Sequence, residues 1–130
     1  MKRLAAVLIA CLTVPASARA CDPGGGQYIL RTEALAAALS SVPSPIEPGE
    51  PFDLVFTLCS RLGFVTEVRV DARMPAHRHG MNYRPRVSAQ PDGGFRAVGL
   101  LFHMTGQWEI LIEASVAGRS ERIALPLDIR

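Results

Sequence analysis

The sequence predicts an all-β protein: an antiparallel immunoglobulin-like β-sandwich of about seven strands that follows an N-terminal signal peptide. Short segments alternate apolar and polar residues with the period of two that is typical of half-buried strands. Glycines and prolines separate these segments, and no segment of normal helix length carries a helical pattern. These observations favour a sandwich over an α/β fold.

The N-terminus has the pattern of a secretory signal peptide (residues 1–20). A basic start precedes an apolar stretch at residues 4–14, and a small-x-small cleavage site ends at Ala20. The apolar stretch is too short to span a membrane. We therefore expect export to the periplasm and a single domain at residues 21–130.

The charge of the mature chain argues against a nucleic-acid partner. Removal of Lys2, Arg3 and Arg19 leaves 11 basic residues against 12 acidic ones, a net charge of −1 with no concentrated basic patch. No later stretch is apolar enough to span a membrane. A nucleophile elbow, paired catalytic carboxylates and a phosphate loop are all missing from the sequence, so we do not expect an enzyme.

Two cysteines, Cys21 and Cys59, remain after the signal peptide is removed. An even pair in an oxidising compartment predicts a disulfide, which we favour over two free thiols in a metal site because no C-x-x-C motif occurs. As the first mature residue, Cys21 also raises the alternative of a lipid anchor. Arg19 fits a lipoprotein signal poorly, so we favour a protein without an anchor.

The first half of the domain holds three expected strands. Residues 27–32 have the composition of a first strand. Residues 33–41 are ambiguous, because their alanines and leucines suit a helical turn as well as a continued strand. Four prolines at residues 42–51 force turns and extended conformations. Residues 52–58 and 66–73 then alternate cleanly, with one apolar face each.

The second half of the domain holds four expected strands, at residues 84–89, 95–103, 108–116 and 120–129. The Asp92-Gly93-Gly94 signal predicts a hairpin between the first two. Ala117-Gly118 predicts a tight turn between the last two. Apolar residues alternate in these last two strands, so one face of each is expected to line the core. These residues are Trp108, Ile110, Ile112 and Ala114 in the first and Ile123, Leu125, Leu127 and Ile129 in the second.

Histidines and methionines gather in two short stretches. His77, His79 and Met81 lie at i, i+2 and i+4, so their side chains would point to the same side of an extended loop. The second stretch carries His103 and Met104, and the predicted hairpin would fold it back toward the first. All five residues are therefore expected at one end of the sandwich.

Imidazole and thioether groups together favour copper. Thioether is a soft ligand that selects Cu(I), and imidazole binds either oxidation state. Zinc sites combine histidine with cysteine or carboxylates and rarely use methionine. We therefore predict a copper site, with Cu(I) favoured. The expected ligands are His77, His79, Met81 and His103, with Met74 and Met104 as further candidates.

The same residues allow interpretations without a metal. The histidines could be ordinary surface residues, Met74 could plug the end of the sandwich, and Met104 could pack against Trp108. Four arginines flank the histidines and form either a solvated rim or a docking surface for an acidic partner or anion. They are Arg73, Arg78, Arg84 and Arg86.

Two motifs carry a family resemblance. The pattern Met-Pro-x-His-x-His-Gly-Met at residues 74–81, followed by Phe-x-Met-x-Gly-x-Trp at residues 102–108, resembles the YtkA-like family and the related FixH-like periplasmic domains. The resemblance covers roughly residues 50–128. It implies a small exported immunoglobulin-like sandwich that handles copper or supports the assembly of redox enzymes.

The resemblance can be carried over only where residues match. His77, His79 and Met81 match the first motif, Met104 matches the second, and His103 is an additional residue just before it. From the residues and the resemblance together we predict a copper carrier or chaperone whose partner is a copper acceptor or an exported redox enzyme. The alternative is an accessory domain that docks on such an enzyme without metal.

Overall fold

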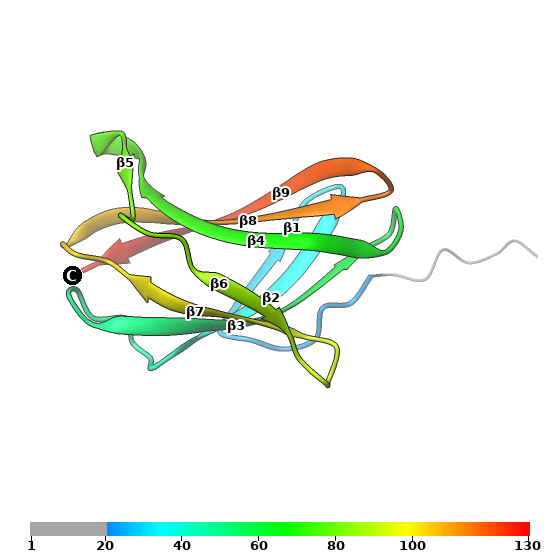
Figure 1. The fold of residues 1–130 in the computed structure, drawn as a ribbon, viewed down its shortest axis with the longest axis horizontal. Helices are drawn as coiled ribbons and strands as arrows, with labels where there is room; N and C mark the ends of the chain where they lie inside the picture. Colours follow the sequence, from blue (N-terminus) through cyan, green and yellow to red (C-terminus); the bar gives the residue numbers. More distant parts are fainter. Residues whose placement is uncertain (1–20) are drawn as a thin grey trace, which may run out of the picture.

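The computed structural model describes residues 21–130, which form nine β-strands in two antiparallel sheets packed face to face (Figure 1). One sheet has the strand order β1-β2-β3-β7-β6 and the other has the order β5-β4-β8-β9. The predicted β-sandwich is thus confirmed. The expected signal peptide and its cleavage site, residues 1–20, lie outside the described residues.

The five-stranded sheet contains β1 (Tyr28–Arg31), β2 (Leu35–Val42), β3 (Pro51–Ser60), β6 (Arg86–Ala89) and β7 (Phe95–Leu101). The four-stranded sheet contains β4 (Val65–Met74), β5 (His79–Gly80), β8 (Gly106–Val116) and β9 (Arg119–Ile129). A short 3-10 helix, η1 (Pro75–His77), links β4 to β5. In the part of the chain that the structure describes, no helix has the length and apolar character that a membrane span requires.

Two strands, β2 and β5, add to the seven that the sequence predicts. β2 forms where the sequence left helix and strand open, and it pairs with both β1 and β3. Ala36, Ala37 and Ala38 are all buried, so small apolar residues at successive positions hide the alternation of this strand. β5 has only two residues, which is too short for any periodic pattern to mark it.

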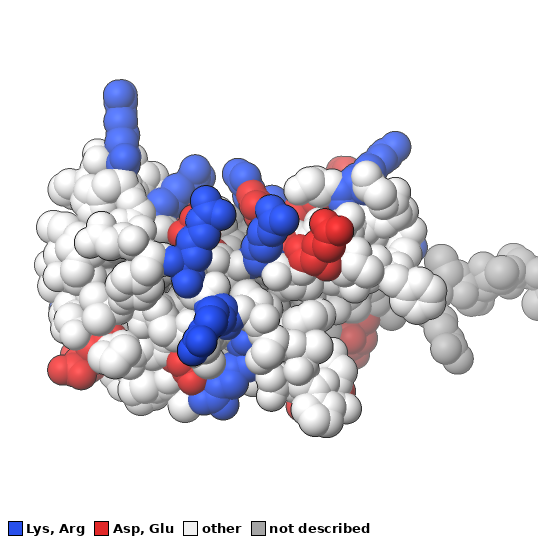
Figure 2. All heavy atoms as spheres, viewed as in Figure 1, with Lys and Arg blue, Asp and Glu red and all other residues white. Residues whose placement is uncertain are grey.

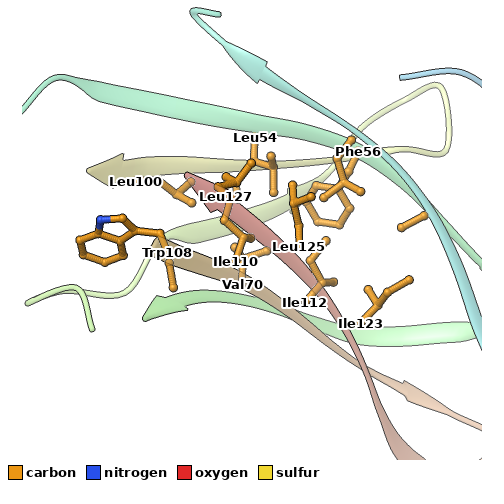
Figure 3. Packing of buried hydrophobic residues seen from close by; sticks show 14 of the residues in the cluster. Leu54, Phe56, Val70, Leu100, Trp108, Ile110, Ile112, Ile123, Leu125 and Leu127 are labelled. Atoms are coloured by element: carbon orange, nitrogen blue, oxygen red, sulfur yellow. The ribbon is translucent and has the colours of Figure 1, made fainter. Parts of the chain in front are cut away.

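Alternating apolar residues fill the space between the sheets (Figure 3). Leu54 and Phe56 of β3 face Ile110 and Ile112 of β8 across the core, and all four are buried. The large indole of Trp108 closes one end of this cluster (Figure 3). The predicted inward faces of these strands are therefore confirmed.

The predicted disulfide joins Cys21 to Cys59, with Cα atoms 5.8 Å apart. It ties the start of the described chain to the end of β3, across 38 residues of sequence. Only Pro23 is buried among residues 22–27, so the link holds a segment that has little other packing.

Replacing Cys21 and Cys59 together by serine is expected to lower the free energy of unfolding by about 4 kcal/mol, because a closed loop of this length restricts the unfolded chain. Urea denaturation under oxidising conditions measures the loss. The native protein treated with a reductant is the matched control and should lose the same amount, while the variant should not respond. Equal stability of the oxidised native protein and the variant would contradict this role.

Candidate metal centre

The chain passes the same end of the sandwich twice (Figure 1). β4 ends there and leads through η1 into β5, and residues 102–105 cross there from β7 in one sheet to β8 in the other. These two connections carry all three histidines of the chain. The predicted hairpin forms between β6 and β7 and returns the chain to this end, and the crossover between the sheets then carries His103 to the other two histidines.

A tight turn sets the spacing of His77 and His79. η1 ends at Arg78, whose backbone is left-handed, with φ 55° and ψ 31°. The chain then returns along β4, where His79 pairs with Met74. The ring centroids of His77 and His79 lie 5.6 Å apart. The expectation of a uniformly extended loop is wrong, because a turn and not alternation places these two rings side by side.

Gly80 allows β5 to approach β4 closely. A Cβ atom at this position would lie 2.7 Å from the carbonyl oxygen of Ala72. The same oxygen accepts a hydrogen bond of 3.2 Å from the backbone N–H of Met81. Because a strand backbone cannot move aside as a side chain can, only glycine fits here, and His79 is held at the edge of β4.

Trp108 lies against His79 and His103 and supports them. The ring of His103 lies 5.3 Å from that of His79, and the indole meets both imidazoles edge-on at centroid distances of 5.4 and 6.3 Å. The indole is 1% exposed and stacks on Phe102 at 4.5 Å. Its Nε1–H donates a hydrogen bond of 3.0 Å to the carbonyl oxygen of Met104. Trp108 therefore fixes the crossover and forms the floor beneath two histidines.

The three candidate methionines differ in accessibility. Met74 is 1% exposed, and its Cε lies 2.8 Å from where a Cβ at Gly106 would be, so it fills the end of the core. Met81 is partly buried and packs against the same core. Met104 is 37% exposed, so its thioether lies at the surface. Met81 and Met104 are thus the thioethers closest to solvent, and Met74 has the packing role that the sequence left open.

Each of the two neighbouring pairs of imidazoles is spaced as two ligands of one metal can be. As they stand, no three His, Cys, Asp or Glu side chains within residues 21–130 form a group that would hold a metal ion. Two imidazoles that share a tetrahedral metal, at N–metal distances of about 2 Å, have ring centres about 5 Å apart. The two ring pairs, at 5.6 and 5.3 Å, come close to this separation. All three histidines are exposed, so small rotations can redirect their nitrogens.

Comparisons of the chain with protein-family models, with curated proteins and with solved structures find no match. The resemblance to the YtkA-like and FixH-like families, which depends on the motifs at residues 74–81 and 102–108, therefore stays a prediction. The site is interpreted from its own geometry and donor chemistry.

Sequence reasoning missed the parts that Gly80 and Trp108 play in this site. In the sequence Gly80 is noted only as part of the motif at residues 74–81, and Trp108 only as a residue against which Met104 could pack. The position of Trp108 four residues after Met104 and five after His103 was the available signal, because it places a large side chain at the start of the next strand.

Substituting Gly80 by alanine is expected to lower the free energy of unfolding by about 1–3 kcal/mol, because the new Cβ would overlap the carbonyl oxygen of Ala72. The backbone amide of Met81 should also exchange its hydrogen faster, as its hydrogen bond to that oxygen is lost. Urea denaturation and NMR hydrogen exchange measure the two effects.

Gly25→Ala is the matched control, because a Cβ at Gly25 would have no atom within 4 Å. Its stability should stay within about 0.5 kcal/mol of the native value. If Gly80→Ala matched this control in both measurements, the close approach of β5 to β4 would not be what holds His79 in place.

Proposed function

We propose that this protein is a periplasmic copper carrier or chaperone that binds copper at the end of the sandwich, with Cu(I) favoured. His77, His79 and His103 supply imidazoles, and Met81 or Met104 supplies a thioether. The observation that carries the proposal is the pair of ring separations of 5.6 and 5.3 Å, with His79 common to both.

The donor set supports copper over zinc. Both cysteines of residues 21–130 are joined in the disulfide, so a thiolate ligand is excluded there while it stays oxidised. Thioether is a soft ligand that selects Cu(I) and is rare at zinc sites, and imidazole binds copper in either oxidation state. Exposure of all three histidines suits a metal that is passed on, because an acceptor can reach the ligands directly.

Two further arguments support the proposed setting. The disulfide fits an oxidising compartment such as the periplasm, in agreement with the expected signal peptide. The motif resemblance implies copper handling or support of the assembly of redox enzymes. The proposed partner is accordingly a copper acceptor or an exported redox enzyme, and the proposed role is transport rather than catalysis.

Titration with Cu(I) under a competing chelator tests the proposal. We expect one tight equivalent, and we expect the His77→Ala/His79→Ala/His103→Ala variant to lose it, because that variant removes every imidazole in the chain. Cu(II) and Zn(II) are titrated separately to establish selectivity. If the native protein bound no more copper than the variant, with both folded, the metal function would be wrong and a docking role without metal would remain.

Methionine variants distinguish side chains that bind copper from side chains that only pack in the core. Met81→Leu/Met104→Leu is expected to weaken Cu(I) binding by about tenfold or more and to change Cu(II) binding little, because thioether prefers the softer ion. Met74→Leu is the matched control and should keep the native affinity, because this side chain is buried. Equal losses from both variants would point to packing rather than ligation.

A further inference from the structure

The end of the sandwich opposite the histidines carries an exposed apolar loop. The connection from β3 to β4, residues 61–64, lies there together with the β8–β9 turn, at the right-hand end of Figure 1. Phe64 is 93% exposed and Leu62 is 52% exposed. No other large apolar side chain among residues 21–130 is exposed by more than half. These two side chains are called the apolar tip below.

The backbone beneath the apolar tip is held in place. Val65, the first residue of β4, pairs with Val116 of β8, and a Cβ atom at Gly63 would lie 3.7 Å from that of Ala117. The N–H of Leu62 donates a hydrogen bond of 3.0 Å to the Oγ atom of Ser60. The apolar tip therefore projects from a supported loop, and its surface is left outside the packing of the domain.

Exposed arginines accompany the apolar tip. Arg61 precedes Leu62, and Arg119 follows the β8–β9 turn; neither has a carboxylate within ion-pair distance in the described part of the chain. Glu33 and Asp92 lie in neighbouring connections, so the charge at this end is mixed. Figure 2 shows the right-hand end as mostly white, with charged side chains concentrated over the middle of the molecule. Apolar surface, not net charge, therefore distinguishes this end.

The size of the apolar tip favours a lipid surface over a protein partner. An aromatic side chain buries about 150–250 Å², whereas each partner in a specific protein complex contributes roughly 800 Å². Two side chains on a projecting loop offer far less than that. A bilayer needs no complementary surface, because apolar side chains can enter the boundary between its head groups and its acyl chains.

The start of the described chain lies at the same end. Cys21 is joined to Cys59, at the end of β3, and lines a small hollow together with Arg61. The apolar stretch of the expected signal peptide, residues 4–14, precedes Cys21 in the sequence. Because such a stretch enters the membrane during export, the end that carries the apolar tip is the one that emerges next to the bilayer.

We propose that the apolar tip docks this domain on the surface of a phospholipid bilayer. Leu62 and Phe64 enter the boundary between head groups and acyl chains, and the guanidinium groups of Arg61 and Arg119 pair with lipid phosphates. The ten residues of β4 lead from the apolar tip to the turn that carries His77 and His79, a distance of about 30 Å. The histidines then face away from the membrane.

Flotation of the exported chain, residues 21–130, with vesicles of phosphatidylcholine and phosphatidylglycerol tests the inference. Leu62→Ser/Phe64→Ser should weaken binding by about tenfold or more, because the variant removes the apolar surface that enters the bilayer. Arg61→Ala/Arg119→Ala should weaken it by about fivefold or more.

Val42→Ser/Tyr83→Ser is the matched control, because these side chains are 46% and 47% exposed and lie toward the histidine end. It should bind within about twofold of the native protein.

A tryptophan at the apolar tip reports where the protein meets the lipid. The emission of Phe64→Trp should shift to shorter wavelength when vesicles are added, because the new indole leaves water. Val42→Trp should show no such shift. Trp108 contributes the same background to both variants, since it is 1% exposed.

Three results would overturn the inference. They are no flotation of the native protein, equal binding of Leu62→Ser/Phe64→Ser and its control, and an emission shift in Val42→Trp but not in Phe64→Trp. Self-association that depended on the apolar tip, without binding to vesicles, would also overturn it and assign the apolar tip to a second copy of the chain. Leu62→Ser/Phe64→Ser should keep its copper affinity, so the metal function and this inference are tested independently.

Discussion

The indole of Trp108 joins the hydrophobic core to the surface on which the histidines lie. It stacks on Phe102 inside the sandwich, and its plane lies at 74° to the ring of His79 and at 89° to that of His103. Its N–H holds the carbonyl of Met104, which fixes the connection between the two sheets. The candidate site therefore depends on a buried aromatic contact, since loss of the indole would free the crossover that carries His103.

Strand alternation explains why most of the fold can be predicted from the sequence. Period-two patterns in β3, β4, β8 and β9 correctly assign the core face, and the even cysteine count correctly predicts Cys21–Cys59. β2 could not be predicted, because its alanines are buried at successive positions and therefore show no alternation of apolar and polar residues. The turn after β4 could not be predicted either. The left-handed conformation of Arg78 and the close contact at Gly80 depend on the neighbouring backbone and not on the alternation of apolar and polar residues.

The approach of His103 to His79 could be predicted in part. The predicted hairpin forms between β6 and β7, and the crossover from β7 to β8, which the sequence does not show, completes the approach. Which methionines reach solvent could not be predicted, because burial of Met74 depends on how the end of the core closes around Gly106. The charge of the arginine rim likewise depends on which arginines find carboxylates across the sheet. Only Arg73 of the four predicted rim arginines is paired in the described structure.

A groove beside β4 reaches His79, so it lies next to the candidate metal site. The proposal that copper binds to these imidazoles can be tested directly. The most direct measurement is the X-ray absorption spectrum of the protein loaded with one equivalent of Cu(I). We predict imidazole nitrogens at about 2 Å together with a sulfur scatterer that disappears in Met81→Leu/Met104→Leu. A spectrum without imidazole scattering would contradict the claim.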